Sequence, residues 1–165
     1  MSTEIHKIKF NNWLLLLLLL GLPYTSWAQS DSVLALTADT VAFSNQKFFD
    51  FIKQASFENK PYLVFFNAPW CAPCHRIKQE IFTHPKIAAL VNNSYLAYTI
   101  DLDNLDGAET NSRFFNVQQL PTILFFDPKG KQTDKAIGYF DGYYLFKKIR
   151  SHIPPSQRGK DWLQE

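Results

Sequence analysis

The sequence reads YLVFFNAPWCAPC from Tyr62 to Cys74, and this stretch decides the fold. Its first five residues, which end at Phe66, are all apolar, as expected for a central strand that is buried on both faces. A turn then leads into Trp70, and two cysteines follow with two residues between them. A helix is predicted from Cys74 to Phe82. The sequence therefore places a pair of thiols where a buried strand gives way to a helix.

This location makes the thiols reactive. The amide groups of a first helical turn stabilise negative charge, so a thiol placed there loses its proton more easily and becomes a nucleophile near neutral pH. With two residues between them, Cys74 can attack the sulfur of Cys71 and resolve a mixed disulfide with a client protein. We expect Cys71 to be the exposed attacking thiol and Cys74 the more buried resolving thiol. Closing so short a loop restricts the unfolded chain little, which favours a reactive disulfide over a purely structural one.

The hydrophobic pattern of the rest of the chain alternates between helices and strands. Further helices are expected to begin at Ser44 and to cover residues 86–92, 108–115 and 141–152. Strands are expected at residues 95–102, 121–126 and 133–140. The early alternation indicates parallel pairing, whereas the turn over residues 127–130 joins the last two strands as an antiparallel hairpin. The predicted fold class is α/β, with a mixed central β-sheet flanked by helices on both faces.

The N-terminus has the pattern of a secretory signal peptide. Lys7 and Lys9 precede the apolar run Trp13–Leu20, and the small residues Ser26 and Ala28 stand at the two positions that a signal peptidase reads. The apolar run is about half of the roughly 20 residues that span a bilayer, and an uncleaved membrane anchor is the alternative. Cleavage after Ala28 predicts a periplasmic protein. In that oxidising compartment a cysteine pair carries a disulfide unless another protein reduces it.

Length and composition indicate one domain and exclude several classes of protein. The 165 residues are 46% hydrophobic, and 17 basic against 15 acidic side chains leave a net charge of +2, which gives no sign of nucleic-acid binding. Two cysteines cannot form a disulfide scaffold or a four-cysteine zinc site. The expected organisation is a signal peptide over 1–28, an N-terminal lead-in over 29–43, one domain over 44–153 and a polar tail over 154–165.

Three more motifs carry a resemblance to a known family. LPT at residues 120–122 enters a predicted strand, FTHP at 82–85 follows the cysteine helix, and IGY at 137–139 precedes the last helix. With the WCAPC motif, they make the sequence resemble the thioredoxin superfamily. Within it, the sequence is most similar to the C-terminal domain of DsbD-type thiol:disulfide interchange proteins and to related exported thioredoxin-like proteins. The resemblance covers residues 44–152 and implies a thioredoxin fold and a thiol–disulfide oxidoreductase.

The resemblance also implies a role for each residue around the cysteines. Cys71 and Cys74 would be the catalytic pair, a redox-active disulfide that needs no dissociable cofactor and no metal. Pro121 is expected to follow a cis peptide bond and to face the disulfide, which leaves backbone groups free to pair with an extended client peptide. The other expected site residues are Trp70 and Leu120 for substrate binding, and Ala72, Pro73 and His75 for tuning the redox potential.

The dipeptide between the cysteines bears on the direction of electron flow. Ala72-Pro73 resembles the Gly-Pro of reducing thioredoxins, so we expect a reductase of client disulfides. The expected partners are client proteins with disulfides or thiols and a membrane protein that donates electrons. We expect a monomer without a nucleic-acid partner. The alternatives are a disulfide oxidase or isomerase, and a non-catalytic thioredoxin-like module that binds peptides along Leu120 and Pro121.

One departure from the family pattern is Phe65, six residues before Cys71. Thioredoxins and many DsbD-type domains have a buried Asp at this position, which accepts and returns the proton of the buried thiol. With Phe65 in its place, we expect slower resolution or a raised pKa of Cys74 compared with relatives that have the acid. Glu80 or solvent would then have to accept the proton.

The residues CAPCH at 71–75 also fit the attachment pattern of a c-type haem. A haem iron usually takes a second axial ligand, and the processed chain has no methionine, which leaves His84 or His152. A zinc site needs about four ligands, for which two cysteines and scattered histidines are a poor fit. The motifs around Trp70 and Pro121 favour the redox interpretation over both.

Overall fold

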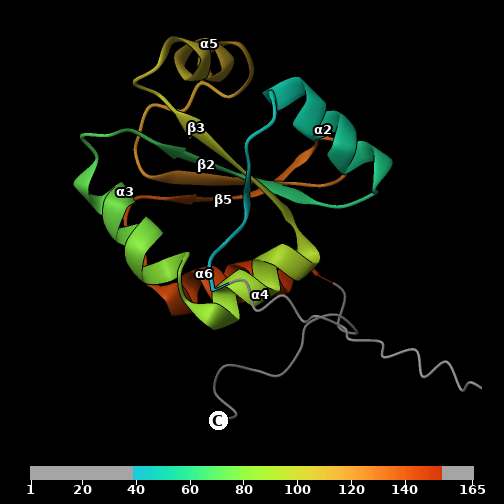
Figure 1. Cartoon of the computed structure of the whole chain (residues 1–165), viewed down its shortest axis with the longest axis vertical. Helices are drawn as coiled ribbons and strands as arrows, with labels where there is room; N and C mark the ends of the chain where they lie inside the picture. Colours follow the sequence, from blue (N-terminus) through green and yellow to red (C-terminus); the bar gives the residue numbers. More distant parts are fainter. Residues whose placement is uncertain (1–38, 154–165) are drawn as a thin grey trace, which may run out of the picture. The chain divides into compact units, whose positions relative to one another are not determined.

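The structure is a computed structural model that describes residues 39–153, which form an α/β fold around one β-sheet (Figure 1). The predicted signal peptide (1–28) and the polar tail (154–165) lie outside the described residues, as does most of the lead-in. Within residues 39–153, no helix combines the length and the apolar character that crossing a membrane requires.

Five strands pair in the order β1-β3-β2-β4-β5, which confirms the mixed sheet expected from the sequence. The strands are β1 (Phe43–Ser44), β2 (Tyr62–Asn67), β3 (Leu96–Asp101), β4 (Thr122–Phe126) and β5 (Gln132–Ile137). Both β1 and β2 run parallel to β3, whereas β4 runs antiparallel to β2 and β5. The carboxylate of Asp127 accepts hydrogen bonds from the backbone N–H groups of Lys129 and Lys131, both at 2.9 Å, and so holds the predicted hairpin turn.

Helices cover both faces of the sheet because the central strand β2 buries side chains on both sides. The helical segments are α2 (Phe48–Phe57), α3 (Ala72–Arg76), the π-helical η1 (Ile77–Ile81), α4 (Pro85–Ser94), α5 (Leu105–Phe114) and α6 (Gly142–Ser151). Leu63 and Phe65 belong to a core that includes residues of α3, η1, α4 and α6. Val64 and Phe66 belong to a second core, to which α2 contributes. In Figure 1, α3, α4 and α6 accordingly lie on one side of the sheet, with α2 on the other.

Several element boundaries differ from those expected: α5 begins at Leu105 instead of residue 108, and β5 ends at Ile137 instead of residue 140. The pattern predicts a helix from Ser44, but this residue lies in β1 and the helix begins at Phe48. The cause is Phe43, whose ring packs 5.1 Å from that of Phe82 and draws the segment onto the sheet. The helix after the cysteines begins at Ala72, ahead of the predicted start, and becomes π-helical at Ile77.

A charged cluster links β5 to the last helix. Lys148 Nζ lies 2.7 Å from Asp134 Oδ2, and His152 Nε2 lies 2.8 Å from the same oxygen. Burial tends to raise the pKa of Asp134. Hydrogen bonds from Lys148, from His152 and from the backbone N–H of Lys135 outweigh burial and lower the pKa to about 2. The carboxylate therefore stabilises the folded protein only while it is ionised.

We expect Asp134→Asn to lower the free energy of unfolding by about 1 kcal/mol at neutral pH, because Lys148 loses its partner. A carboxyl group whose pKa is lowered by folding contributes stability above its ordinary value of 3.8 and loses it as the pH falls toward about 2. The difference between wild type and variant in urea unfolding should therefore shrink from about pH 5 to about pH 2. The control Asp50→Asn removes an exposed carboxylate 3.8 Å from Lys53 and should cost less than about 0.5 kcal/mol. If the difference in stability between wild type and Asp134→Asn did not change with pH, the lowered pKa of Asp134 would be contradicted.

Candidate active site

The two cysteines form a disulfide at the start of α3. Cys71 is the N-cap residue of this helix, and its Sγ accepts a hydrogen bond from the backbone N–H of Cys74 at 3.2 Å. Cys71 is 3% exposed and Cys74 is 1% exposed. The prediction of an exposed Cys71 is therefore wrong for the disulfide form, because its sulfur turns back toward the first turn of α3. The predicted place of the pair, between a buried strand and the start of a helix, is confirmed, and amide groups there favour a negatively charged sulfur.

The loop before β4 reaches the same edge of the sheet as the disulfide. Thr122 pairs with Phe66 near the end of β2, and from that end the chain continues to Cys71. The peptide bond between Leu120 and Pro121 is cis, as the resemblance implies. Leu120 packs against the core cluster that contains both cysteines. The fold therefore brings Leu120, from a distant part of the sequence, to the core cluster that contains the disulfide.

Backbone groups of this loop differ in whether they are already paired. The carbonyl oxygen of Pro121 accepts a hydrogen bond from the N–H of Gly138 at 2.8 Å, and that of Gln119 accepts one from Thr122 Oγ1 at 2.7 Å. Within residues 39–153, the N–H and C=O of Leu120 form no hydrogen bond. Leu120 therefore differs from Gln119 and Pro121, whose carbonyl oxygens are already paired.

Trp70 is a surface residue beside the disulfide. It is 70% exposed, and its indole Nε1 donates a hydrogen bond to Asp103 Oδ1 at 3.3 Å. Asp103 lies between β3 and α5, where its own N–H donates to Asp101 Oδ1 at 2.9 Å. His75 is also exposed, and its Nε2 lies 2.7 Å from the carbonyl oxygen of Pro69 in the preceding loop. The sequence around Asp103 is acidic, but it does not indicate this link to Trp70, because the two residues are 33 positions apart.

At the position of the family's buried acid, Phe65 packs against other aromatic rings. Its ring meets that of Phe82 edge-on at 5.0 Å and lies 6.4 Å from that of Phe43, and the residue is fully buried. Glu80 does not supply a carboxylate at this place. It is exposed and accepts a hydrogen bond from the Tyr139 hydroxyl at 3.0 Å.

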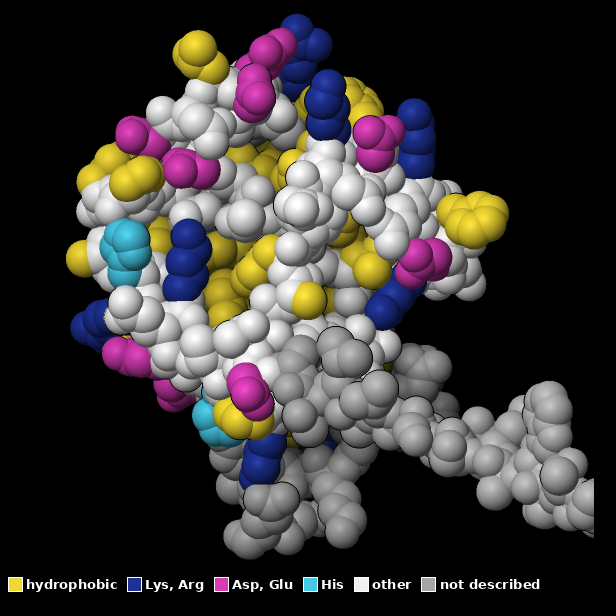
Figure 2. All heavy atoms as spheres, viewed as in Figure 1, with side chains coloured by type: hydrophobic (Ala, Val, Ile, Leu, Met, Phe, Trp, Pro, Cys, Tyr) yellow, Lys and Arg dark blue, Asp and Glu magenta, His cyan; other side chains and the backbone are white. Residues whose placement is uncertain are grey.

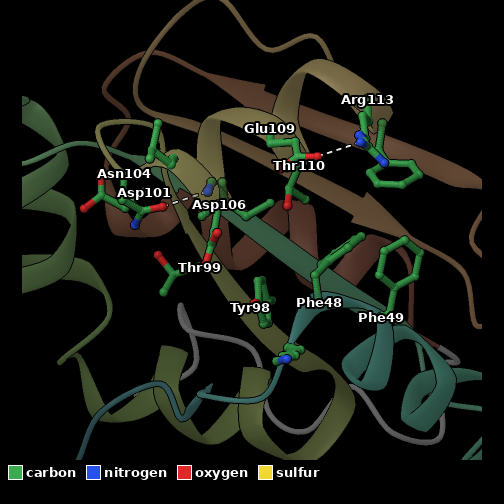
Figure 3. A pocket seen from close by; sticks show the side chains of 15 residues that line it. Phe48, Phe49, Tyr98, Thr99, Asp101, Asn104, Asp106, Glu109, Thr110 and Arg113 are labelled. Atoms are coloured by element: carbon green, nitrogen blue, oxygen red, sulfur yellow. Dashed lines mark hydrogen bonds and ion pairs between the residues drawn. The ribbon is translucent and has the colours of Figure 1, made fainter.

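A separate depression of about 700 Å³ lies between α2, β3 and α5 (Figure 3). Phe48 and Phe49 line one side of it, and Asp101 and Asp106 line the other. Burial, followed by the charge of Asp106, raises the pKa of Tyr98 in its wall. None of the residues predicted for the site lines this depression. The space-filling view shows hydrophobic groups interspersed with acidic and basic ones over α2 and α5 (Figure 2).

No metal cluster accompanies the cysteines in the described part of the chain, where no three His, Cys, Asp or Glu side chains are placed to hold an ion. The disulfide joins two cysteines with two residues between them. It lies at the start of a helix, at the same sheet edge as the loop with the cis-proline. These features define a thiol–disulfide oxidoreductase with the thioredoxin fold. The chain belongs to the thioredoxin-like domain family, whose model matches residues 48–153.

Relatives within this family are DsbD proteins. The chain is 28% identical to the thiol:disulfide interchange protein DsbD of Escherichia coli strain K12 over 137 residues, which make up 80% of this chain and 24% of DsbD. DsbD of Photorhabdus laumondii is 24% identical over 144 residues, which make up 86% of this chain and 25% of the relative. The chain therefore spans about a quarter of the length of these curated relatives.

Solved structures confirm the fold. A thioredoxin from Thermus thermophilus superposes with a TM-score of 0.60 at 17% identity, over 68% of this chain and 86% of the thioredoxin. The oxidoreductase DsbH superposes with a TM-score of 0.58 at 16% identity, over 69% of this chain and 86% of DsbH. At these identities the likeness concerns the thioredoxin fold alone.

Proposed function

We propose that the protein is an exported thiol–disulfide reductase, which passes two electrons from its cysteine pair to disulfides of periplasmic clients. The observation that carries the proposal is the Cys71–Cys74 disulfide at the start of α3. In the proposed reaction the Cys71 thiolate attacks a client disulfide and releases one client thiolate. Cys74 then attacks Cys71, and the second client thiolate leaves. Two electrons and two protons pass to the client, and the pair ends as the disulfide.

The client would bind along the loop that holds Pro121. The unpaired N–H and C=O of Leu120 offer an extended peptide two backbone hydrogen bonds, in the manner of an added strand. Trp70, held by Asp103, gives the site an exposed apolar edge. Ala72, Pro73 and His75 would tune the redox potential from the first turn of α3.

The direction of electron flow is inferred from similarity. Ala72 and Pro73 stand between the cysteines, where reducing thioredoxins have Gly-Pro. The relatives at 28% identity are named thiol:disulfide interchange proteins. We propose that signal peptide 1–28 is removed after Ala28 and that a membrane protein reduces the exported domain between turnovers.

Two assays on the exported protein test this function. With dithiothreitol as electron donor, the protein should accelerate the reduction of insulin at least tenfold over dithiothreitol alone. The oxidised protein should form disulfides in reduced, unfolded ribonuclease only slowly. Faster oxidation than reduction would identify an oxidase instead, and no turnover in either assay would identify a peptide-binding module. Mass spectrometry of the exported chain should give an N-terminus at Gln29.

A further inference from the structure

Lys78 lies beside the apolar site where the family has its acid. Its Nζ is 5.9 Å from the centre of the Phe65 ring and donates a hydrogen bond to Asn67 Oδ1 at 2.5 Å. Asn67 is 5% exposed, and its Nδ2 donates to Thr99 Oγ1 at 2.9 Å and to the carbonyl oxygen of Ile100 at 3.0 Å. A buried amide that is itself fixed by β3 therefore holds the ammonium group against the sheet.

Two observations direct this charge toward Cys74. Lys78 follows Cys74 by four residues across the junction of α3 and η1, which places it about one helical turn further along the chain. Phe65, over whose ring the ammonium lies, belongs to the same core cluster as both cysteines. Phe65 and Asn67 are two positions apart on β2, which places both on the face of the sheet that α3 and η1 cover.

No carboxylate neutralises this ammonium. In the described part of the chain, no Asp or Glu forms an ion pair with Lys78, and its hydrogen-bond partner is the neutral amide of Asn67. The other charged or titratable groups on the elements around the cysteines contact residues other than Lys78. His75, Asp101 and Asp103 have neutral partners, whereas Arg76 and Glu80 both contact Tyr139 and also attract each other. Lys78 therefore places an ammonium group, without a carboxylate partner among the described residues, beside Phe65 in the core cluster that contains the cysteines.

We propose that the Lys78 ammonium stabilises the thiolate of Cys74 and so speeds the step that releases the client. In that step Cys74 loses its proton, its sulfur bonds to Cys71 Sγ, and the bond from Cys71 to the client sulfur breaks. The client thiolate takes up a proton from water. An ammonium group cannot accept the Cys74 proton, as a carboxylate can, but it lowers the free energy of the thiolate that remains.

The effect of Lys78 on the pKa of Cys74 is opposite to the effect expected from Phe65 alone. The loss of the family's acid predicts a raised pKa of Cys74, whereas a nearby cation lowers it. The release step belongs to the proposed function. The effect of Lys78 on Cys74 is nevertheless measured without any client, so the two can fail separately.

Titration of the thiolate absorbance at 240 nm tests the inference in a Cys71→Ser background, where Cys74 is the remaining thiol. Lys78→Gln keeps a donor for Asn67 but removes the charge, and it should raise the pKa of Cys74 by about one unit. Lys78→Arg should leave that pKa near its original value. The matched control is Lys53→Gln on α2, which removes one charge from the opposite face and should change nothing. Lys78→Met provides a second neutral variant if the first does not fold.

A second experiment measures the rate of the release step directly. In proteins with both cysteines, the reduced pair reacts with an aromatic disulfide, and the second aryl thiolate appears when Cys74 attacks the mixed disulfide. A tenfold smaller thiolate fraction, partly offset by the greater nucleophilicity of a more basic thiolate, should slow this phase about threefold in Lys78→Gln at neutral pH. An unchanged pKa of Cys74 in both neutral variants overturns the inference. A Lys78→Arg variant in which the pKa of Cys74 rises as far as in Lys78→Gln also overturns it. If the Lys78 variants change the pKa of Cys74 as predicted but the wild-type protein does not reduce insulin, the proposed function is contradicted instead.

Discussion

Cys74→Ser is expected to convert the protein into a covalent trap for its clients. Cys71 would still attack a client disulfide, but the serine hydroxyl cannot attack the mixed disulfide and release the client. Turnover in the insulin assay should fall by at least a hundredfold, while mixed disulfides with clients accumulate. Non-reducing electrophoresis followed by mass spectrometry would detect them as adducts that disappear on reduction.

The matched control for this trap is Cys71→Ser. It also abolishes turnover, but without the attacking thiol it should form few or no adducts. Equal numbers of adducts in the two variants would contradict the assigned roles of Cys71 and Cys74. No adducts in Cys74→Ser would indicate a module that binds peptides without exchanging disulfides.

The second large effect is expected from Phe65→Asp, which restores the residue type of the family. In thioredoxins an acid at this position takes part in proton transfer, but here the site is fully buried between the rings of Phe43 and Phe82. The substitution removes a large buried ring and introduces a carboxyl group that must be desolvated. We expect the free energy of unfolding to fall by about 4 kcal/mol, measured by urea denaturation.

Phe65→Leu separates the loss of packing from the burial of a polar group. Leucine keeps the site apolar, and it should cost about 1 kcal/mol. An aspartate variant that is as stable as the leucine variant would show that the site accommodates a carboxylate after all. That result would contradict the view that aromatic packing has replaced the acid.

Local pattern was enough to predict the centre of the fold. Five consecutive apolar residues predict a strand buried on both faces, and Tyr62 to Phe66 are each at most 5% exposed. The spacing of Cys71 and Cys74 and their place after this strand predict the disulfide at a helix start. The cis bond before Pro121 follows from the family resemblance, because periodicity carries no information about peptide isomers.

Contacts between distant parts of the chain were not predictable in the same way. Asp103 meets Trp70 because parallel pairing brings the ends of β2 and β3 to one edge, and nothing near Asp103 in the sequence indicates this. Lys78 reads as one of several polar residues on the outer side of a helix, but its partner Asn67 comes from the strand before it. Ser44 has the character of a helix cap, yet the packing of Phe43 decides its place in β1.

The central claim is that the Cys71–Cys74 pair is a reductant. Equilibration of the exported protein with defined thiol buffers, followed by quantification of free thiols, gives the reduction potential of the pair. The proposed function predicts a value at or below about −230 mV, in the range of thioredoxins and glutaredoxins. A value near −120 mV would resemble that of a strong oxidant and would contradict the claim, because such a pair donates disulfides to its clients.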